Sequence, residues 1–366
     1  MKLMNVIVIF SFLVPITAIG GNIFVGKSGS DFYDGTTRNT PFLTINKALE
    51  AAYPGDSIYL SPGVYHENIV TVRDGLLESP ISIKGLRNES DYLDLDNQTK
   101  NVLLRPTIKP PKKNNGRLIQ IRHSYITLQD VVVDGLFDGG DSPESYTDKL
   151  LFVHNTDRLD GLTGIHIRRV TFRNAGGECI RFRYKIVRSS IKDSFISNCG
   201  VHAFVYKLGG KNGEGIYVGT SIKQWEDGKN PASDPDTTSK NTFSRNVINT
   251  LGNECIEFKE GAFNNWAVDN TCMGQMDGNS GGLASRGNSN YFYGNRIVAP
   301  AGSGLYFSSD SPSYGMNNVA KRNIIVAAGR YGIDDRGDDG AMCENSSSYS
   351  RSGESSSGRS INEQCN

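Results

Sequence analysis

The sequence has no excess of charge of either sign, because its 366 residues include 39 Lys and Arg against 39 Asp and Glu. A general nucleic-acid binder would usually be basic overall, so this balance argues against that class. Beyond one apolar run at the N-terminus, the chain offers no candidate for a membrane span. It also shows no P-loop, zinc-ligand spacing or Ser-His-Asp pattern. We therefore expect neither nucleic acid nor a membrane as partner.

The N-terminal apolar run predicts a signal peptide over residues 1–20. Lys2 supplies the positive start, residues 6–13 form the apolar stretch, and residues 18–20 offer a small-residue cleavage site. The run is short for a membrane span. We expect the mature chain to be soluble, secreted and extracellular, and to be a monomer.

Six cysteines fit an oxidising compartment and allow many disulfide connectivities. We expect Cys343 to pair with Cys365, since that bond would tether a Ser-rich tail. Cys272 falls at an inward-facing position, where a buried free thiol is one interpretation. Three sequons could carry glycans in a eukaryotic source, and they begin at Asn88, Asn97 and Asn345.

Helical apolar spacing does not persist anywhere along the chain, but a different motif returns about once every two dozen residues. The anchor residues of this motif are Phe172, Ile196, Ile248, Cys272, Ile297 and Ile325, with spacings of 24, 52, 24, 25 and 28. We interpret the spacing of 52 as two turns of the coil with additional loop residues in the middle. An apolar residue lies eight positions after most anchors, namely Ile180, Phe204, Ile256, Leu305 and Ile333. After Cys272 the match moves to Leu283, as a short insertion would cause.

Self-similarity at a fixed period predicts a solenoid. Each repeat carries short, alternating, β-branched runs broken by Asn and Gly, so its unit is made of strands. Asn recurs at one phase, at Asn246, Asn270, Asn295 and Asn323. Stacked Asn side chains form hydrogen-bonded ladders in a parallel coil. An ordinary β-sandwich is the alternative, but it gives no reason for a recurrent Asn.

The residues before the repeats predict a short helix. Thr44 is a plausible N-cap, and Ile45, Ala48, Leu49 and Ala52 would share one face. The apolar core of a parallel coil is open at its end and must be covered. We expect this helix to be the cap.

This N-terminal segment resembles the one shared by secreted right-handed parallel β-helix proteins of the pectate-lyase-like superfamily. The matching segments are residues 29–31, 34–36, 44–49, 54–60 and 62–65. The resemblance implies an all-β chain, a single-stranded right-handed parallel β-helix over 21–340. It leaves function open, because the superfamily holds lyases, hydrolases, epimerases and adhesins. The low-complexity composition after Asn345 predicts a Ser-rich, flexible tail over 341–366.

A column of mostly basic residues lies eleven positions after the anchors: Arg183, Lys207, Lys259, Arg286 (allowing for the insertion), Ser308 and Arg336. Their parity points them outward. Stacked turns lie about 4.8 Å apart. Like charges at that spacing repel unless an anion or neighbouring carboxylates compensate. Such a stripe suits an acidic polysaccharide. The alternative is a solvated surface balanced by Glu254, Glu257 and Glu260.

Residues 252–261, with Asn265, 270–271 and 281–288, resemble the catalytic region of chondroitinase-B-like and alginate lyases. In that family a glutamate five residues before a lysine binds calcium, the lysine is the base, and an arginine one turn later assists. The resemblance therefore implies Glu254 as a Ca²⁺ ligand, Lys259 as the base and Arg286 as its assistant.

The chemistry explains these residue types. β-Elimination removes a weakly acidic proton next to a uronate carboxylate, so it needs positive charge there and a base within reach. Lys259 can serve as the base if a neighbouring cation lowers its pKa, and Arg286 is the expected neighbour.

The sequence departs from that family at three places. Gly252 stands where a second carboxylate ligand is usual, Gly287 replaces a common His, and the loop between Lys259 and Arg286 is longer. Other oxygen ligands for Ca²⁺ would then be needed, and the candidates are Glu257, Glu214, Asp234 and Asp236.

Other residues could bind or act on a sugar. Tyr217 and Tyr306 could stack on sugar rings, although aromatic side chains more often pack in the core. His202 is a candidate acid or substrate contact, although a lone His is usually structural. The acidic residues 334–339 could hold Ca²⁺ or give a hydrolase its acid/base pair, although a solvated turn is the plainer interpretation.

The first hypothesis is thus a polysaccharide lyase-like enzyme that acts on an acidic, uronate-containing glycan with Lys259, Arg286 and Ca²⁺. The second is a non-catalytic carbohydrate-binding or matrix protein, which the missing ligand at Gly252 favours. The third is a glycoside hydrolase that uses Asp334 and its neighbours.

Overall fold

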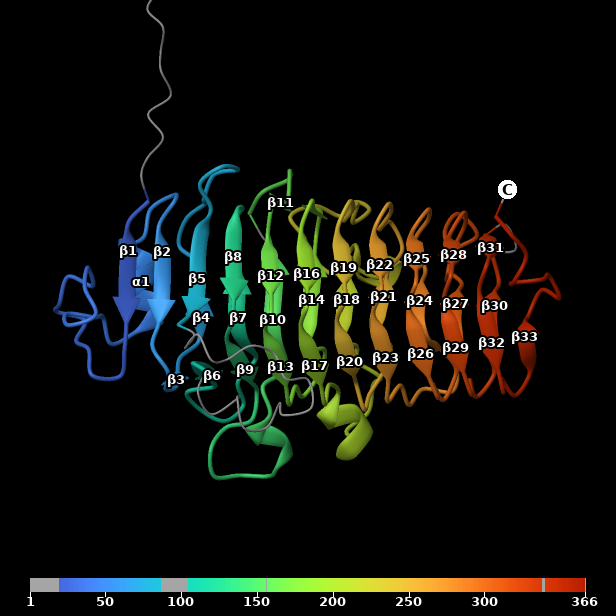
Figure 1. Cartoon of the computed structure of the whole chain (residues 1–366), viewed down its shortest axis with the longest axis horizontal. Helices are drawn as coiled ribbons and strands as arrows, with labels where there is room; N and C mark the ends of the chain where they lie inside the picture. The colour runs from blue at the N-terminus through green and yellow to red at the C-terminus, as the bar shows by residue number, and fades with distance from the viewer. Residues whose placement is uncertain (1–19, 87–104, 156, 338–339, 366) are drawn as a thin grey trace, which may run out of the picture.

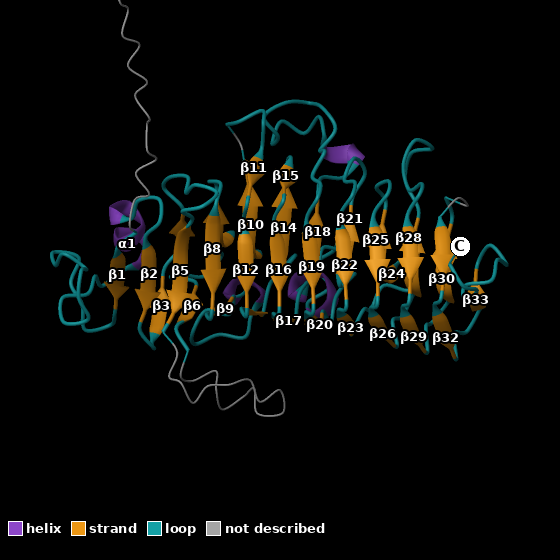
Figure 2. Ribbon diagram, turned by 45° about the horizontal axis from the view of Figure 1, so that its top comes forward, coloured by secondary structure: helices purple, strands orange, loops and turns teal. Residues whose placement is uncertain are grey.

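The strands of the chain stack side by side along one axis and give an elongated molecule (Figure 1). The computed structural model describes residues 20–86, 105–155, 157–337 and 340–365. The predicted signal peptide and the sequons at Asn88 and Asn97 lie outside these residues. Figure 2 shows the strands side by side along the axis, each running across it, with few and short helical segments.

Three long sheets run the length of the molecule, and every pairing within them is parallel. The first sheet has the order β1 (Asn22–Val25), β2 (Ser57–Leu60), β5 (Ile81–Gly85), β8 (Ile126–Gln129), β12 (His166–Arg168), β16 (Ser190–Lys192), β19 (Thr242–Ser244), β22 (Trp266–Val268), β25 (Tyr291–Tyr293), β28 (Val319–Lys321) and β31 (Ala341–Cys343).

The second sheet has the order β4 (Ile69–Val70), β7 (Arg117–Ile121), β10 (Lys149–His154), β14 (Ile180–Arg183), β18 (Ile216–Val218), β21 (Ile256–Phe258), β24 (Gly281–Ser285), β27 (Ser303–Phe307), β30 (Tyr331–Asp335) and β33 (Gly353–Ser355). The third sheet has the order β3 (Val64–His66), β6 (Thr107–Lys109), β9 (Val132–Asp134), β13 (Thr171–Arg173), β17 (Phe195–Ser197), β20 (Val247–Asn249), β23 (Thr271–Met273), β26 (Arg296–Val298), β29 (Ile324–Val326) and β32 (Ser346–Ser348). A short pair, β11 (Leu162–Thr163) with β15 (Ile186–Val187), lies beside them.

Successive turns contribute one strand to each sheet, so the chain is a right-handed parallel β-helix, as predicted. The predicted anchors stack directly in the third sheet, where Phe172 pairs with Ile196 and Ile297 with Ile325. Inward aromatic side chains of neighbouring turns also contact one another in edge-to-face or tilted pairs, with ring centroids 5.3 to 5.9 Å apart, through Phe182, Phe243, Phe258, Phe292 and Phe307. Full burial of each such ring contributes roughly 1.5–3 kcal/mol.

The predicted Asn ladder is present at the turns between the first and third sheets. The Asn270 amide donates 3.0 Å to Asn295 Oδ1 and accepts 3.0 Å from Asn246 Nδ2. The ladder continues through Asn323 to Asn345, which is itself 1 % exposed. These amides satisfy buried backbone groups at each bend, which is why a side chain with both a donor and an acceptor recurs there.

The spacing of 52 between Ile196 and Ile248 is one turn rather than two, because these two residues pair directly. Ile216, not the predicted Phe204, occupies the core position between Ile180 and Ile256. Gly200, with φ of 75°, turns the chain out of the coil into a π-helix, η3 (Val201–Val205). A second excursion after β18 carries a 3₁₀-helix, η4 (Ile222–Gln224).

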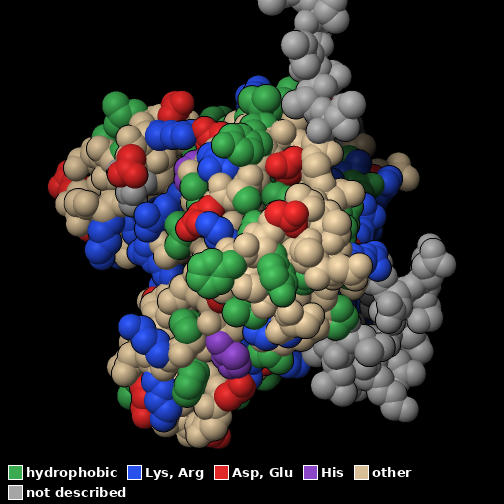
Figure 3. Space-filling model, turned by 90° about the vertical axis from the view of Figure 1, so that its left-hand side faces the viewer, with side chains coloured by type: hydrophobic (Ala, Val, Ile, Leu, Met, Phe, Trp, Pro, Cys, Tyr) green, Lys and Arg blue, Asp and Glu red, His purple; other side chains and the backbone are tan. Residues whose placement is uncertain are grey.

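Helix α1 (Ile45–Ala51) caps the N-terminal end of the coil, as predicted. The Thr44 side chain accepts a hydrogen bond from the Lys47 N–H, and the Glu67 carboxylate accepts another from the Ile45 N–H. Ile45, Ala48 and Leu49 are buried against the core. Figure 3 looks onto this capped end, where hydrophobic side chains are scattered among polar and charged ones.

The predicted flexible tail over 341–366 is wrong, because β31, β32 and β33 extend all three sheets beyond residue 340. Ser side chains are small enough to continue the coil, Asn345 continues the ladder, and Ile361 is fully buried. Because the Asn345 amide is buried in that ladder, its sequon cannot accept a glycan in the folded chain.

Three disulfides connect the six cysteines. The predicted Cys343–Cys365 bond is present, and Cys179 pairs with Cys199. Cys272 is bonded to Cys255, so its interpretation as a free thiol is wrong. Among the described residues, the longest helices are too short or too polar to cross a bilayer.

Candidate active site

The outward face of the second sheet carries the predicted basic column. Strand pairing places Lys259, Arg286, Ser308 and Arg336 at equivalent positions, one residue after paired positions of β21, β24, β27 and β30. Lys207 is not part of it. It is exposed beyond η3, and Gly219 takes the equivalent position between Arg183 and Lys259. The insertion of η3 shifts the register, which sequence spacing alone did not reveal.

Three buried glutamates meet beside this column. Glu214 and Glu254 precede β18 and β21 by two residues, and Glu257 lies within β21. Their carboxylate oxygens lie within 4.8 Å of one another, and the residues are only 3 %, 1 % and 1 % exposed. They line a pocket of about 290 Å³ with Tyr217, Lys259 and Arg286.

The departure at Gly252 has a steric reason. A Cβ at this position would lie 2.4 Å from the Cys199 carbonyl oxygen and 2.7 Å from that of Gly213, so no glutamate fits. Glu214, from the preceding turn, supplies a carboxylate instead. Gly287 is similarly enclosed, since a Cβ there would lie 2.0 Å from the Ala262 carbonyl oxygen.

Glu257 lies between the two candidate catalytic cations. Its Oε2 is 2.6 Å from Lys259 Nζ, and its Oε1 accepts a 2.8 Å hydrogen bond from Arg286 Nε. Burial alone would raise the pKa of Glu257, but Lys259 and Arg286 outweigh it and hold that pKa below its usual value.

The expectation that Arg286 lowers the pKa of Lys259 below its ordinary value is wrong for the protein without a bound ligand. Burial disfavours the ammonium, but Glu257, Tyr217 and Glu214 together outweigh it and raise the pKa of Lys259 above its ordinary value. Arg286 acts in the predicted direction, but it lies on the far side of Glu257 and contributes less. Lys259 is therefore a cation in this structure.

The pKa values of the other two glutamates are shifted in the opposite direction. Burial, followed by Glu257 and Glu214, raises the pKa of Glu254 well above its usual value. Burial, followed by Glu178 and Glu257, raises the pKa of Glu214 to about 7. Ser280 donates to Glu254 Oε1, while Glu254 Oε2 and Asn253 Oδ1 have no hydrogen-bond partner among the described residues. A hard divalent cation takes carboxylate and amide oxygens, so this set of donors fits Ca²⁺.

Asp236, predicted as a further ligand, lies outside this cluster. Its carboxylate accepts hydrogen bonds from the backbone of Tyr184 and Lys185 and from the hydroxyls of Thr220 and Thr238. This carboxylate is fully buried and holds the loop after β18 against β14.

His202 also lies away from the pocket. Its Nε2 donates a 2.9 Å hydrogen bond to the Pro143 carbonyl, which ties η3 to the 3₁₀-helix η2 (Pro143–Ser145). The candidate acids Asp334 and Asp335 are paired, the first with Arg330 and Arg336 and the second with Arg359.

The two predicted sugar-stacking tyrosines are mostly covered by cations. Lys259 Nζ lies 4.6 Å from the Tyr217 ring centroid, and Tyr217 is 5 % exposed. Burial raises the pKa of Tyr217 to about 12, so its hydroxyl stays protonated. The Arg336 guanidinium lies 5.0 Å from the Tyr306 ring centroid, and that ring is 7 % exposed. Both rings serve as supports under basic groups.

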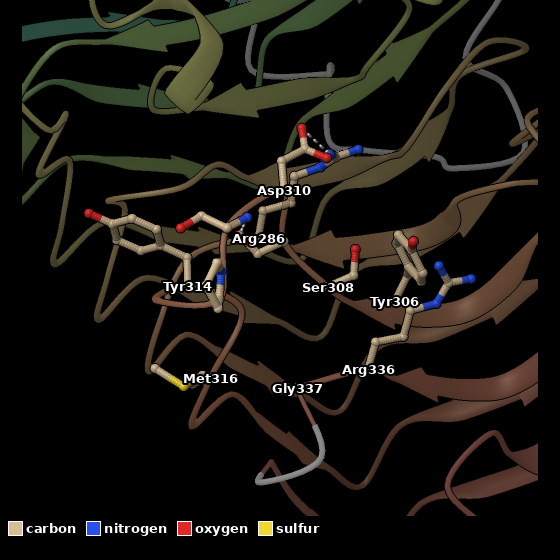
Figure 4. Close-up of a pocket in the computed structure, with 11 residues that line it drawn as sticks. Arg286, Tyr306, Ser308, Asp310, Tyr314, Met316, Arg336 and Gly337 are labelled. Carbon is tan, nitrogen blue, oxygen red and sulfur yellow. Dashed lines mark hydrogen bonds and ion pairs between the residues drawn. The ribbon is translucent and has the colours of Figure 1, made fainter.

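A second pocket of about 560 Å³ adjoins the first and shares Arg286 with it. Figure 4 shows Arg286 directed toward Asp310, and Arg336 beside Tyr306 across the pocket. Arg286 NH1 is 3.4 Å from Asp310, which also pairs with Lys223 at 2.7 Å. The loops after β18 and β27 thus meet over the column. Sequence reasoning missed Asp310 and Ser280, which lie in loops without a repeat phase.

Sequence comparisons match only parts of this chain. Residues 27–72 match the family described as a protein of unknown function (DUF1565). A segment of 114 residues is 28 % identical to the "Uncharacterized protein YwoF" of Bacillus subtilis (strain 168). That segment spans 31 % of this chain and 23 % of the relative.

Solved structures match nearly the whole chain. An alginate lyase from Paenibacillus sp. str. FPU-7 superposes with a TM-score of 0.64 and 16 % identity, over 88 % of this chain and 95 % of that one. The fold is that of known polysaccharide lyases. Pectate lyase Pel9A has a TM-score of 0.53 and 12 % identity, over 89 % of this chain and 71 % of its own. A structure described as a glycoside hydrolase has a TM-score of 0.54 and 11 % identity, over 92 % and 95 %. Together they support the parallel β-helix fold.

Proposed function

We propose that this protein is an exported polysaccharide lyase that cleaves an acidic, uronate-containing glycan by β-elimination. The observation that carries the proposal is the arrangement of Lys259 and Arg286 around Glu257, beside two further buried glutamates in one pocket. The fold shared with an alginate lyase and a pectate lyase supports it. The three disulfides support an oxidising, extracellular location.

In the proposed reaction, Arg286 binds and neutralises the uronate carboxylate. Lys259 removes the proton from the carbon that bears this carboxylate. The glycosidic C–O bond on the next carbon breaks, its electron pair leaves with the oxygen, and a carbon–carbon double bond forms. The leaving oxygen takes up a proton from water. Cations at these positions, one buried and one half-buried, stabilise the charge that develops beside the carboxylate.

Lys259 must first lose its own proton, since in the structure it pairs with Glu257. Glu214, Glu254 and Glu257, with the Asn253 amide, are the residues that would hold Ca²⁺. When bound, the ion would supply positive charge that neutralises the uronate and lowers the pKa of the adjacent ammonium. The Tyr217 ring under Lys259 fixes the position of the amine.

The test is the ultraviolet absorbance of unsaturated uronate products. Purified protein is incubated with pectate, alginate, glucuronan, chondroitin sulfate or dermatan sulfate, with Ca²⁺ or with a chelator. We expect absorbance to rise on one substrate, and Lys259→Ala to reduce the rate at least about a hundredfold, the usual contribution of a general base. Lys321→Ala is the matched control, since Lys321 also pairs with a carboxylate but lies in the first sheet.

Two outcomes would replace the proposal. Binding without absorbance, weakened but retained in Lys259→Ala, would indicate a non-catalytic carbohydrate-binding protein. Release of saturated sugars that ignores Lys259 but fails in Asp334→Asn or Asp335→Asn would indicate a glycoside hydrolase.

A further inference from the structure

We propose that the second sheet carries an additional anion-binding subsite, formed by Arg117, Arg122, His154 and Arg183, that holds a carboxylate or sulfate of the polysaccharide several sugar units from the scissile bond. This inference rests on the proposed function. It makes the preferred ligand an anionic polymer rather than a short fragment.

Strand pairing extends the basic column beyond the residues that the sequence spacing revealed. Val153 of β10 pairs with Ile121 of β7 and with Phe182 of β14. The residues that follow, Arg122, His154 and Arg183, therefore occupy the same outward column as Lys259 and Arg286. At about 4.8 Å per strand, Arg183 lies about 10 Å from the Lys259 position and Arg122 about 19 Å from it.

The side chains of this cluster surround His154. The imidazole stacks on Phe152 with ring centroids 4.3 Å apart, and the Arg117 guanidinium covers the Phe152 ring at 4.1 Å. Arg122 Nε donates a 3.3 Å hydrogen bond to His154 Nε2. The Gln120 amide oxygen accepts a 2.9 Å hydrogen bond from Arg122 NH2, so the guanidinium is held from two sides.

His154 is neutral and incompletely satisfied. It is 1 % exposed, and its Nδ1 has no hydrogen-bond partner among the described residues. Burial, followed by Arg117, Arg122 and Arg183, lowers the pKa of His154 to about 3. The ring therefore adds no positive charge beside Arg117 and Arg122.

The nearby carboxylates are already paired. Asp148 and Glu178 bind Lys149 at 2.6 and 2.9 Å, Glu178 also binds Arg181, and Asp227 binds Arg183 at 2.9 Å. Within the described part of the chain, neither Arg117 nor Arg122 forms an ion pair. Two guanidiniums without counter-ions, one of them exposed, would be stabilised by an anion that bridges them.

The spacing of the basic residues along the column indicates the length of the ligand that the subsite prefers. The column runs along the coil axis from Arg122 past Lys259 to Arg336, and a polysaccharide laid along it presents its acidic groups at intervals. A fragment that reaches only Lys259 and Arg286 cannot also reach Arg122. A longer one can, so the additional subsite adds affinity only for long chains.

The experiment measures binding by calorimetry in the Lys259→Ala background, where cleavage does not interfere. The probes are disaccharides and hexasaccharides of galacturonate, mannuronate, guluronate and glucuronate, with sulfated chondroitin hexasaccharide to distinguish sulfate from carboxylate. We expect Arg122→Gln and Arg117→Gln to weaken hexasaccharide binding about tenfold each, the loss of one charge-assisted contact. Disaccharide binding should not change. Arg122→Lys should retain part of the affinity.

The matched control is Arg296→Gln, an exposed arginine of the third sheet. Hexasaccharide binding that both glutamine variants leave unchanged would overturn the subsite. Equal losses for disaccharide and hexasaccharide would also overturn it, since they would indicate a general structural effect. If no substrate is cleaved but hexasaccharide binding still depends on Arg122, the subsite stands and the lyase function falls.

Discussion

At the scale of single residues, Glu257 decides the electrostatics of the pocket. The sequence suggested a lysine whose pKa a neighbouring arginine lowers, and it offered Glu257 as a metal ligand or as one of three carboxylates that balance a solvated surface. In the folded chain this carboxylate touches both cations, at 2.6 and 2.8 Å, and is 1 % exposed. A buried anion shared by two cations is therefore both a structural contact and a control on the candidate base.

Replacement of this anion should be costly. We expect Glu257→Gln to lower the free energy of unfolding by about 3–5 kcal/mol, because it leaves buried Lys259 without its carboxylate and removes one of the two carboxylates that Arg286 contacts. Chemical denaturation measures the loss. Glu344→Gln is the control, since Glu344 pairs with Lys321 and Arg322 near the surface and should lose less than about 1 kcal/mol. Equal losses in the two variants would contradict the assigned burial of the Glu257 pair.

Glu254 should matter for metal rather than for folding. Its Oε2 has no hydrogen-bond partner in the part of the chain that the structure describes, and its charge is disfavoured by burial. We expect Ca²⁺ to raise the melting temperature of the native sequence and Glu254→Gln to remove most of that rise, since a ligand that binds only the folded state stabilises it. Thermal unfolding with Ca²⁺ or chelator provides the measurement. Glu226→Gln, in an exposed loop, is the control. A Ca²⁺-induced rise that survives in Glu254→Gln would place the ion elsewhere.

At the scale of elements, the sequence predicts the strand positions correctly in those turns that carry no insertion. The third-sheet anchors and the capping helix could be predicted, because inward apolar residues and an N-cap have local signatures. The turn between Ile196 and Ile248 could not be predicted, because η3 contains an apolar Phe204 at a misleading distance. Only strand pairing shows that Ile216 fills the core there.

The Asn ladder yields a prediction about these turns. Asn270 accepts from the backbone and side chain of Asn246 and donates to Asn295 and to the Phe243 carbonyl. We expect Asn270→Ala to cost about 2–4 kcal/mol, because several buried backbone and amide groups lose their partners. Exposed Asn39 is the control for the same substitution. Denaturation midpoints measure both, and a loss at Asn270 no larger than at Asn39 would contradict a structural role for the ladder.

At the scale of the whole molecule, the buried glutamates couple stability to pH. The folded state raises the pKa of Glu214 from an ordinary 4.5 to about 7. A carboxyl with a raised folded pKa binds its proton more tightly in the folded state. Its contribution is fully present below about pH 4.5 and is lost as pH rises through 7.

We therefore expect the melting temperature without Ca²⁺ to fall by several degrees between pH 5 and pH 8. The Glu214→Gln variant should show a smaller fall over the same range, because an amide does not titrate. Calorimetry at each pH, in the presence of a chelator, provides the measurement. A Glu214→Gln profile that coincides with that of the native sequence would show that other groups set the pH dependence.

The sequence by itself determined the coil, its cap, the Asn ladder, the Cys343–Cys365 bond and the positions of Lys259, Arg286 and Glu254. Each of these depends on a local period or on residues close along the chain. The tertiary structure alone decided that Glu214 lies beside Glu254 and Glu257 while no glutamate fits at Gly252, that Glu257 joins two cations, and that Arg122 and His154 continue the basic column. These contacts lie across turns of unequal length, so only the register of the stacked strands brings their residues together.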